Sequence, residues 1–326
     1  MLESGVFTVS LDFELFWGVR DKRSIAEYRE NLSGVRVAIS ELLKLFNEYG
    51  IHATWATVGF LFFKDANQLK QNLPQLQPQY LDQNLSPYKY IDNNTEMQAQ
   101  YHFAPDIIDT IRRNQGQEIG THTLCHYYCL AEGQSVANFS DDLSGAVQIA
   151  NKKGIALQSL VFPRNECNQE YLPTLRQFGV LSYRGNANSS IYQPDEKKNS
   201  ILRRGLRLLD SYLNISGHNT CDFIDCIRTR PYNFPASLLL RPYSDKLDFL
   251  SGLKLRRITK AMDHAAEQKR LFHLWWHPHN FGVNLQRNIE FLRKILEHYK
   301  KLQQKTGIVS LNMGELAALA EGYHEN

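Results

Sequence analysis

A regular alternation of strand-like and helix-like segments constrains the fold of this 326-residue chain more than any other feature. Residues 6–11 (VFTVSL) have the composition of a buried strand. Residues 34–49 place apolar side chains on one helical stripe that ends at Gly50, and residues 51–58 predict a second strand. Strand, helix and strand in this order predict a parallel sheet or a barrel.

The same alternation continues to the end of the chain. Further helices are predicted at 105–115, 139–153 (with Ser140 as N-cap), 168–178, 252–268, 285–303 and 313–321, and further strands at 157–162, 180–183, 271–276 and 308–311. No linker-like break or internal repeat interrupts the pattern, so we expect a single α/β domain over residues 1–326. Residues 64–100 are rich in Gln, Asn, Pro and Tyr and predict an inserted region, either a lid or a surface loop without a role. Residues 186–250 are less regular.

Composition narrows the class of protein. A net charge of +3 argues neither for nor against a nucleic-acid partner, and with no long basic run we expect no nucleic-acid polymer. No apolar stretch is long enough to predict a membrane-spanning helix. The start of the chain lacks a basic segment followed by an apolar one, so we expect a cytoplasmic protein. The odd count of five cysteines favours reduced thiols over a disulfide framework.

Two acidic residues follow the first predicted strand, at the end where α/β folds carry their chemistry. Asp12 and Glu14 stand two residues apart, a spacing that directs both side chains to the same face of a strand. One can bind a metal while the other accepts a proton. The alternative is an exposed acidic loop, although the large apolar neighbours in DFELFW favour a role.

Two histidines follow another predicted strand, in the stretch GTHTLCH. On a helical turn, His122 and His126 would share one face and could hold one cation, and neutral imidazole is a common zinc ligand. Chance spacing or simple packing is the alternative. A structural zinc site that also uses Cys125 and Cys129 is a second possibility, but we favour buried, unreactive cysteines.

Three more ionisable residues follow predicted strands. His277, in LWWHPHNFG, is a candidate general acid or a hydrogen-bonding core residue, and His279 is a packing or supporting residue. Arg164, in VFPRNECN, can clamp a carboxylate through two hydrogen bonds or can be an ordinary surface arginine.

The order of these motifs resembles the polysaccharide deacetylase family, the NodB-homology domain of carbohydrate esterase family four, over residues 6–315. SLDFE is an Asp-x-Glu variant of the family's first motif, and HTLCH matches the second. The resemblance implies a distorted barrel of about seven β/α units. It further implies that Asp12 is the base and that Glu14, His122 and His126 are the metal ligands.

The resemblance also assigns the remaining residues. FPRN is a looser match to a motif whose arginine pairs with the base, which implies that Arg164 holds Asp12. LWWH matches the motif of the catalytic acid and implies that role for His277. Asp210, in LRLLDSYLNISG, is our candidate for the aspartate that tunes the acid.

The function implied is hydrolysis of an N-acyl group, first of all N-acetyl, from a sugar or glycan precursor with one divalent metal. We prefer zinc, and iron or cobalt also suits these ligands. A cytoplasmic enzyme favours a nucleotide- or lipid-linked sugar as substrate. The alternatives are an amidase or deformylase acting on another small substrate, and a non-catalytic sugar-binding domain. Four tryptophans are candidates to stack on a sugar ring, although we expect core positions, above all for Trp275: Trp17, Trp55, Trp275 and Trp276.

Overall fold

The computed structural model describes residues 2–94, 96–193 and 201–325. Its strands form one sheet in the order β6-β5-β4-β3-β2-β1-β8-β7, and β9 also pairs with β1. Every strand pairing is parallel. The strands are β1 (Val6–Phe13), β2 (Ala53–Thr57), β3 (Gln117–Thr121), β4 (Ser159–Val161), β5 (Ser182–Arg184), β6 (Tyr232–Asn233), β7 (Leu238–Leu239), β8 (Leu271–Trp276) and β9 (Val309–Ser310).

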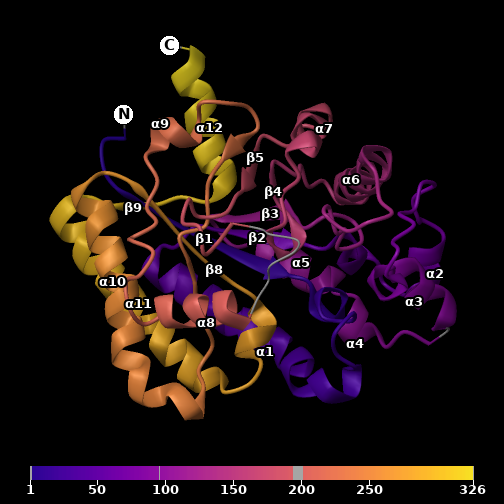
Figure 1. The fold of residues 1–326 in the computed structure, drawn as a ribbon, viewed down its shortest axis with the longest axis horizontal. Helices are drawn as coiled ribbons and strands as arrows, with labels where there is room; N and C mark the ends of the chain where they lie inside the picture. Colours follow the sequence, from indigo (N-terminus) through magenta and orange to yellow (C-terminus); the bar gives the residue numbers. More distant parts are fainter. Residues whose placement is uncertain (1, 95, 194–200, 326) are drawn as a thin grey trace.

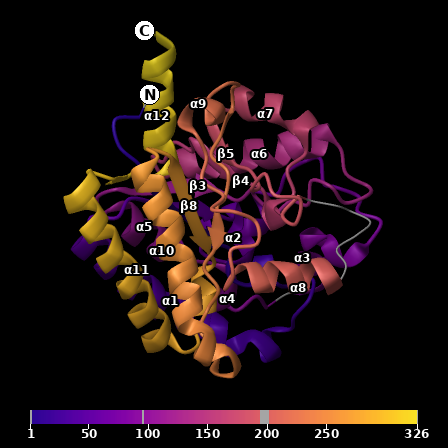
Figure 2. The ribbon, with the colours of Figure 1, turned by 60° about the vertical axis from the view of Figure 1, so that its left-hand side comes forward.

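Helices surround this curled sheet (Figure 1), which confirms the predicted distorted β/α barrel. Helices α1, α10 and α11 pack side by side on its outer surface, as both ribbon views show (Figure 2). The α-helices are α1 (Ile25–Tyr49), α2 (Ala66–Lys70), α3 (Pro87–Asn93), α4 (Ala99–His102), α5 (Pro105–Arg112), α6 (Val136–Asn151), α7 (Leu172–Gln177), α8 (Ile201–Asp210), α9 (Phe223–Cys226), α10 (Ser251–Glu267), α11 (Leu285–Thr306) and α12 (Met313–Glu325).

A short connection bridges the two edges of the sheet. Strands β6 and β7 end the strand order, and within the described residues they do not pair with each other. Residues 234–237 run between them. The Phe234 N–H donates to the Tyr183 carbonyl on β5 at 3.0 Å, and the Ser237 N–H donates to the His273 carbonyl on β8 at 2.8 Å. The wall is therefore completed here by a loop rather than by paired strands.

Local sequence explains the longest helix. Ser24 and Glu27 form a capping box at the start of α1, and Gly50 ends the helix at φ 63°, a conformation that favours glycine. Buried residues including Leu42 and Phe46 form its core-facing stripe. The predicted stop at Gly50 is confirmed, whereas the helix begins earlier than predicted, at Ile25.

The inserted region is packed rather than open. Residues 64–100 contain α2, α3 and short turns, and they bury Tyr80, Tyr88 and Ile91. The Tyr80 hydroxyl accepts a hydrogen bond from the Tyr128 N–H at 3.0 Å, which ties the insertion to the loop after β3. Its role as a lid stays a prediction.

Other elements depart from the predictions in detail. Helix α6 is capped by Ser135, so the prediction of Ser140 as the cap is wrong; the Ser135 hydroxyl accepts from the Asn138 N–H. The irregular region 186–250 holds the short strands β6 and β7, and α8 and α9. In the described part of the chain, no helix is both long and apolar enough to span a bilayer.

Candidate metal centre

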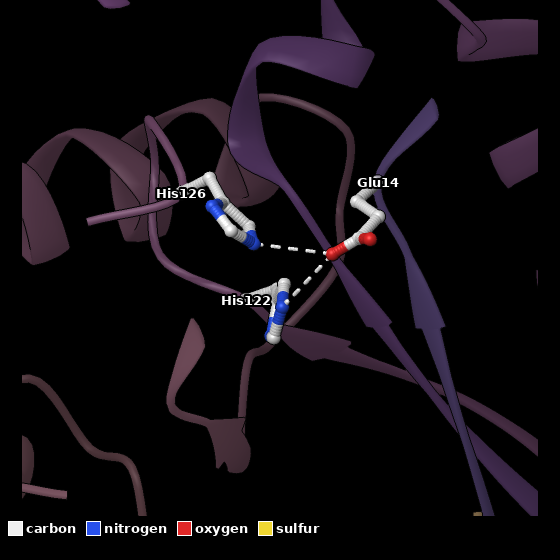
Figure 3. Close-up of side chains that lie close together, drawn as sticks. All are labelled: Glu14, His122 and His126. Atoms are coloured by element: carbon white, nitrogen blue, oxygen red, sulfur yellow. Dashed lines mark ion pairs between the residues drawn. The ribbon is translucent and has the colours of Figure 1, made fainter. Parts of the chain in front are cut away.

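Three buried side chains from two loops meet at the carboxyl ends of β1 and β3 (Figure 3). The Glu14 Oε2 atom lies 3.3 Å from His122 Nε2 and 3.1 Å from His126 Nε2. Their candidate ligand atoms all lie within 4.8 Å of one another. The structure therefore brings together the three residues that the sequence predicted as ligands, in a group that can hold a metal ion.

The two histidines reach this position from a loop, not from a helical turn. After β3 the backbone turns through left-handed conformations at Thr123 (φ 65°) and His126 (φ 62°). The geometric argument from helical spacing is therefore wrong, although the two imidazoles do lie close together. The imidazole rings are brought to a centroid distance of 5.0 Å by this turn.

A buried carboxylate on α6 holds the loop from behind. Asp142 accepts hydrogen bonds from the Leu124 N–H at 2.7 Å and from the Cys125 N–H at 3.2 Å. Burial raises the pKa of Asp142 to about 6, although these hydrogen bonds favour its charged form. Because both amides lie between the two histidines, Asp142 fixes the spacing of the imidazoles.

The hydrogen bonds of the imidazoles test whether a cation fits. The His122 Nδ1 atom lies 2.8 Å from the Val161 carbonyl oxygen, so Nδ1 carries the proton. In neutral His122, the unprotonated Nε2 then faces a Glu14 oxygen, and one acceptor opposes another. Burial lowers the pKa of His126 to about 4, so this ring is neutral at pH 7. A metal ion between these lone pairs fits the donor set, and the Val161 carbonyl orients a ligand as supporting groups do in metal sites.

Asp12 is held in a different way from Glu14. Arg184, the last residue of β5, donates from Nη1 to Asp12 Oδ1 and from Nη2 to Oδ2, each at 2.8 Å. Both side chains are almost completely buried. Burial opposes ionisation of Asp12, but the charges of Arg184, His122 and His277 hold its pKa below the ordinary value. One carboxylate thus faces imidazoles and the other faces a guanidinium.

Arg164 does not make the expected contact with Asp12. The backbone of Arg164 is left-handed (φ 58°), and its guanidinium donates to Asp21 and lies over the Tyr128 ring at 4.1 Å. The predicted pairing is corrected to Arg184, which sequence reasoning missed. A signal was present, because Arg184 directly follows the predicted strand 180–183.

His277 lies against both carboxylates. Its Nε2 atom is 3.7 Å from Asp12 Oδ2 and 3.5 Å from Glu14 Oε1. The side chain is 24% exposed, so it meets both the buried centre and solvent. His279 is buried and stacks on His277 with ring centroids 5.0 Å apart. Burial, together with the charge of His277, lowers the pKa of His279 to about 3, which makes His279 a neutral supporting ring.

Asp210 does not belong to this site. It is buried at the end of α8, where it accepts hydrogen bonds from the Tyr192 hydroxyl and the Ser216 N–H and pairs with Arg257 at 3.4 Å. These bonds hold the loop after α8, and no contact with His277 is present among the described residues. The assignment of Asp210 as the aspartate that tunes the acid is therefore corrected.

The tryptophans divide into two groups. Trp17, Trp55 and Trp276 are completely buried core residues. Trp275 is partly exposed, so the expectation of a core position is wrong for this residue. Its ring lies 5.7 Å from the His277 ring and 4.3 Å from the Arg184 guanidinium carbon, which places Trp275 at the edge of the centre.

The cysteines near the histidines are packing residues. Cys125 and Cys129 are completely buried, and burial raises the pKa of both thiols well above the ordinary value. Neither belongs to the metal-capable group found in the described residues. The structure thus agrees with the interpretation of unreactive, buried cysteines.

Comparison with known proteins identifies the fold. The sequence matches no family model and no curated protein. A Mycobacterium smegmatis structure named as a polysaccharide deacetylase is similar at a TM-score of 0.63 and 13% identity, over 99% of this chain and 92% of that chain. Puue allantoinase is similar at a TM-score of 0.59 and 11% identity, over 99% and 93%. A Pseudomonas aeruginosa PAO1 structure named as a polysaccharide deacetylase is similar at 0.55 and 11%, over 97% and 91%.

These likenesses cover nearly the whole chain at low identity, so they establish a shared fold. The protein therefore has the NodB-type barrel of the polysaccharide deacetylases, the fold that the sequence motifs implied.

Proposed function

We propose that the protein is a metal-dependent hydrolase that removes an N-acyl group, first of all N-acetyl, from a sugar or glycan precursor. The proposal rests on one observation: two neighbouring carboxylates have different partners. Glu14 faces the imidazoles of His122 and His126, whereas Asp12 is held by Arg184. This arrangement separates a metal ligand from a proton acceptor.

Glu14, His122 and His126 would hold the cation. One carboxylate and two imidazoles favour zinc, and the same set accommodates iron or cobalt. When bound, the cation supplies Lewis-acid polarisation of the amide carbonyl and lowers the pKa of water.

Asp12 takes the proton from the attacking water in this mechanism. The paired hydrogen bonds from Arg184 keep the Asp12 carboxylate charged and fix its plane. Because Arg184 is itself bonded to the Asn165 side-chain oxygen at 2.7 Å, the pair has little freedom to rotate. The base is thus oriented before substrate arrives.

His277 returns a proton to the leaving nitrogen. Its Nε2 atom lies within 3.7 Å of a carboxylate oxygen of both Asp12 and Glu14. The side chain is partly exposed, so an amine that accepts its proton can leave toward solvent. The neutral His279 ring stacked beside it fixes the plane of the imidazole. The products are the free amino sugar and a carboxylic acid, which is acetic acid for an N-acetyl group.

The test combines metal analysis with product release. We expect about one divalent metal per chain after purification or reconstitution with zinc or cobalt, and acetate release from N-acetylated sugars. Formate or another acid released from a non-sugar amide would instead assign the protein as an amidase or deformylase. Absence of metal after reconstitution would overturn the hydrolase and favour a sugar-binding domain.

A further inference from the structure

A cavity of about 680 Å³ adjoins the candidate metal centre. Trp275 and Asn165 line the cavity and also touch the centre. Trp275 packs against His277, and Asn165 accepts hydrogen bonds from Arg184. These two residues form a shared wall, so a molecule that reaches His277 lies beside the cavity.

Positive side chains dominate the lining of this cavity. Its arginines come from the loop after β4, from α8 and from the segment after β7: Arg164, Arg204, Arg207 and Arg241. Glu166 is the carboxylate residue among the lining residues. The lining therefore carries an excess of positive charge, in a protein whose net charge is only +3.

Neutral groups hold two of the lining arginines in place. The Arg207 Nε–H donates to the Ile191 carbonyl at 2.7 Å, and the Arg241 Nε–H donates to the Ser211 hydroxyl at 2.7 Å. Over residues 2–94, 96–193 and 201–325, no carboxylate lies within ion-pair distance of Arg204, Arg207 or Arg241. Neutral acceptors thus orient Arg207 and Arg241, and no carboxylate of the described residues forms an ion pair with either guanidinium.

The arginine-rich lining of the cavity suits an anionic ligand. Arg241 is largely withdrawn from water, and this burial, together with the charge of Arg207, lowers the pKa of Arg241. Phosphate oxygens accept paired hydrogen bonds from guanidinium groups and neutralise their charge. A neutral sugar carries no negative charge to balance these guanidiniums.

We propose that this cavity binds the phosphate or diphosphate group of the substrate, which makes the substrate a phosphorylated, N-acylated sugar. This inference rests on the proposed function and narrows its substrate class. A sugar ring lying on Trp275 would direct its acyl group toward His277 and its phosphate toward Arg204 and Arg241.

Two kinds of molecule offer this chemistry. A nucleotide-linked sugar and a lipid-linked sugar both carry a phosphate or diphosphate next to the sugar. Helix α8 and the turn after it also expose Leu202, Leu209 and Leu213, with 72%, 50% and 52% of their surfaces accessible. These leucines flank the arginines of the cavity and offer an apolar surface for a lipid chain.

The first measurement is calorimetric binding of inorganic diphosphate to the His126→Ala protein. This variant lacks a proposed metal ligand, so diphosphate should not bind to a metal at the centre. The measurement also does not depend on whether the protein removes acyl groups. We expect saturable binding at one site, weakened about 10–100-fold by the pair Arg204→Gln and Arg241→Gln. The exposed Arg228, which pairs with Asp225, supplies the control Arg228→Gln, which should bind like its parent.

Several results would overturn the proposal: no saturable binding, binding unaffected by the paired substitution, or equal weakening by Arg228→Gln. Arg204→Gln alone keeps the test decisive if the paired variant misfolds, because Arg204 is exposed on α8. Displacement of diphosphate by uridine diphosphate would identify a nucleotide-linked substrate, and displacement by a polyprenyl phosphate in neutral micelles a lipid-linked one. Displacement by neither would overturn the assignment of the cavity to substrate.

Discussion

Carboxylates at the two ends of the same sheet have different hydrogen-bond partners. At the amino ends of β2 and β3, Glu118 Oε2 accepts from the Thr54 hydroxyl at 2.6 Å and from the Gly314 N–H at 2.9 Å. Nearby, Glu315 lies 2.7 Å from His52 Nδ1. These carboxylates meet donors and attach α12 to the barrel, which is a structural role.

At the carboxyl ends, Glu14 meets the imidazoles of His122 and His126, and the His122 Nδ1–H donates to the Val161 carbonyl. Buried polarity alone therefore does not mark a functional site. The informative sign is that His122, whose Nδ1 faces the Val161 carbonyl, turns Nε2 toward a carboxylate oxygen, an arrangement that suits a bound cation.

Removal of a proposed metal ligand should have the largest effect. His126→Ala should abolish metal binding and reduce hydrolysis by more than the about 10–100-fold typical of losing a supporting residue. Metal content by mass spectrometry and acetate release would measure both effects. His298→Ala is the matched control, because His298 on α11 pairs with Asp263 on α10 at 2.6 Å and is not a candidate ligand. Retained stoichiometric metal in His126→Ala would remove this histidine from the ligand set.

A second comparison sets two arginines against each other. Arg184→Met removes the partner of a buried carboxylate and should lower the free energy of unfolding by about 3–5 kcal/mol. Arg164→Met should lower it by less, because the Arg164 side chain is 28% exposed and Asp21 keeps the hydrogen bond from the Tyr128 hydroxyl. Urea denaturation of both variants measures the difference. Equal losses would contradict the assignment of Asp12 to Arg184.

A third experiment tests the support of the histidine loop. Asp142→Ala frees the amides of Leu124 and Cys125 and should weaken metal binding about 10–100-fold. Competition with a chelator gives the affinity. The neighbouring Asp141, whose carboxylate bonds to the exposed Leu76 N–H, provides the control Asp141→Ala. If both variants bind metal like the parent, the loop does not depend on this anchor.

The smallest expected effect belongs to the amino end of the sheet. The hydrogen bond with Glu315 raises the pKa of His52 above its ordinary value of 6.5. The folded state therefore binds this proton more tightly, so the stabilisation is complete below about pH 6.5 and is lost as the pH rises through the folded pKa. Because the pair is partly exposed, the loss should stay under about 1 kcal/mol.

Urea midpoints at pH 6 and pH 8 measure this loss. Glu315→Gln keeps an acceptor for the Asn312 N–H but removes the charge, so the variant should lose less stability between these two pH values. The same slope in the variant would assign the pH dependence to other groups.

Much of the centre follows from sequence because its residues stand directly after strands with strong local patterns. Glu14, His122 and His277 each belong to a short segment that leaves the sheet at one end, and parallel strands bring such segments together. The barrel itself follows from the same alternation of strands and helices.

What could not be predicted depends on tertiary geometry. Arg164 lies in the turn after β4, and Arg184 is the last residue of the neighbouring strand β5. The left-handed backbone at Arg164 turns its side chain toward Asp21, and no local pattern distinguishes the two arginines. Arg204 and Arg241 line the same cavity, but both come from a region of the sequence without clear periodicity. The sequence pattern therefore could not predict that they lie close together.

The connection at residues 234–237 has a consequence for how this protein accommodates change. Ala236 and Ser237 line the cavity at the place where two strands do not pair. A continuous ladder would have fixed both the spacing and the side-chain direction there. Because residues 234–237 form a loop, the shape of the cavity there does not depend on the register of the strands. Substitutions at residues 236 and 237 should therefore change the shape of the cavity while Glu14, His122 and His126, on the loops after β1 and β3, keep their positions.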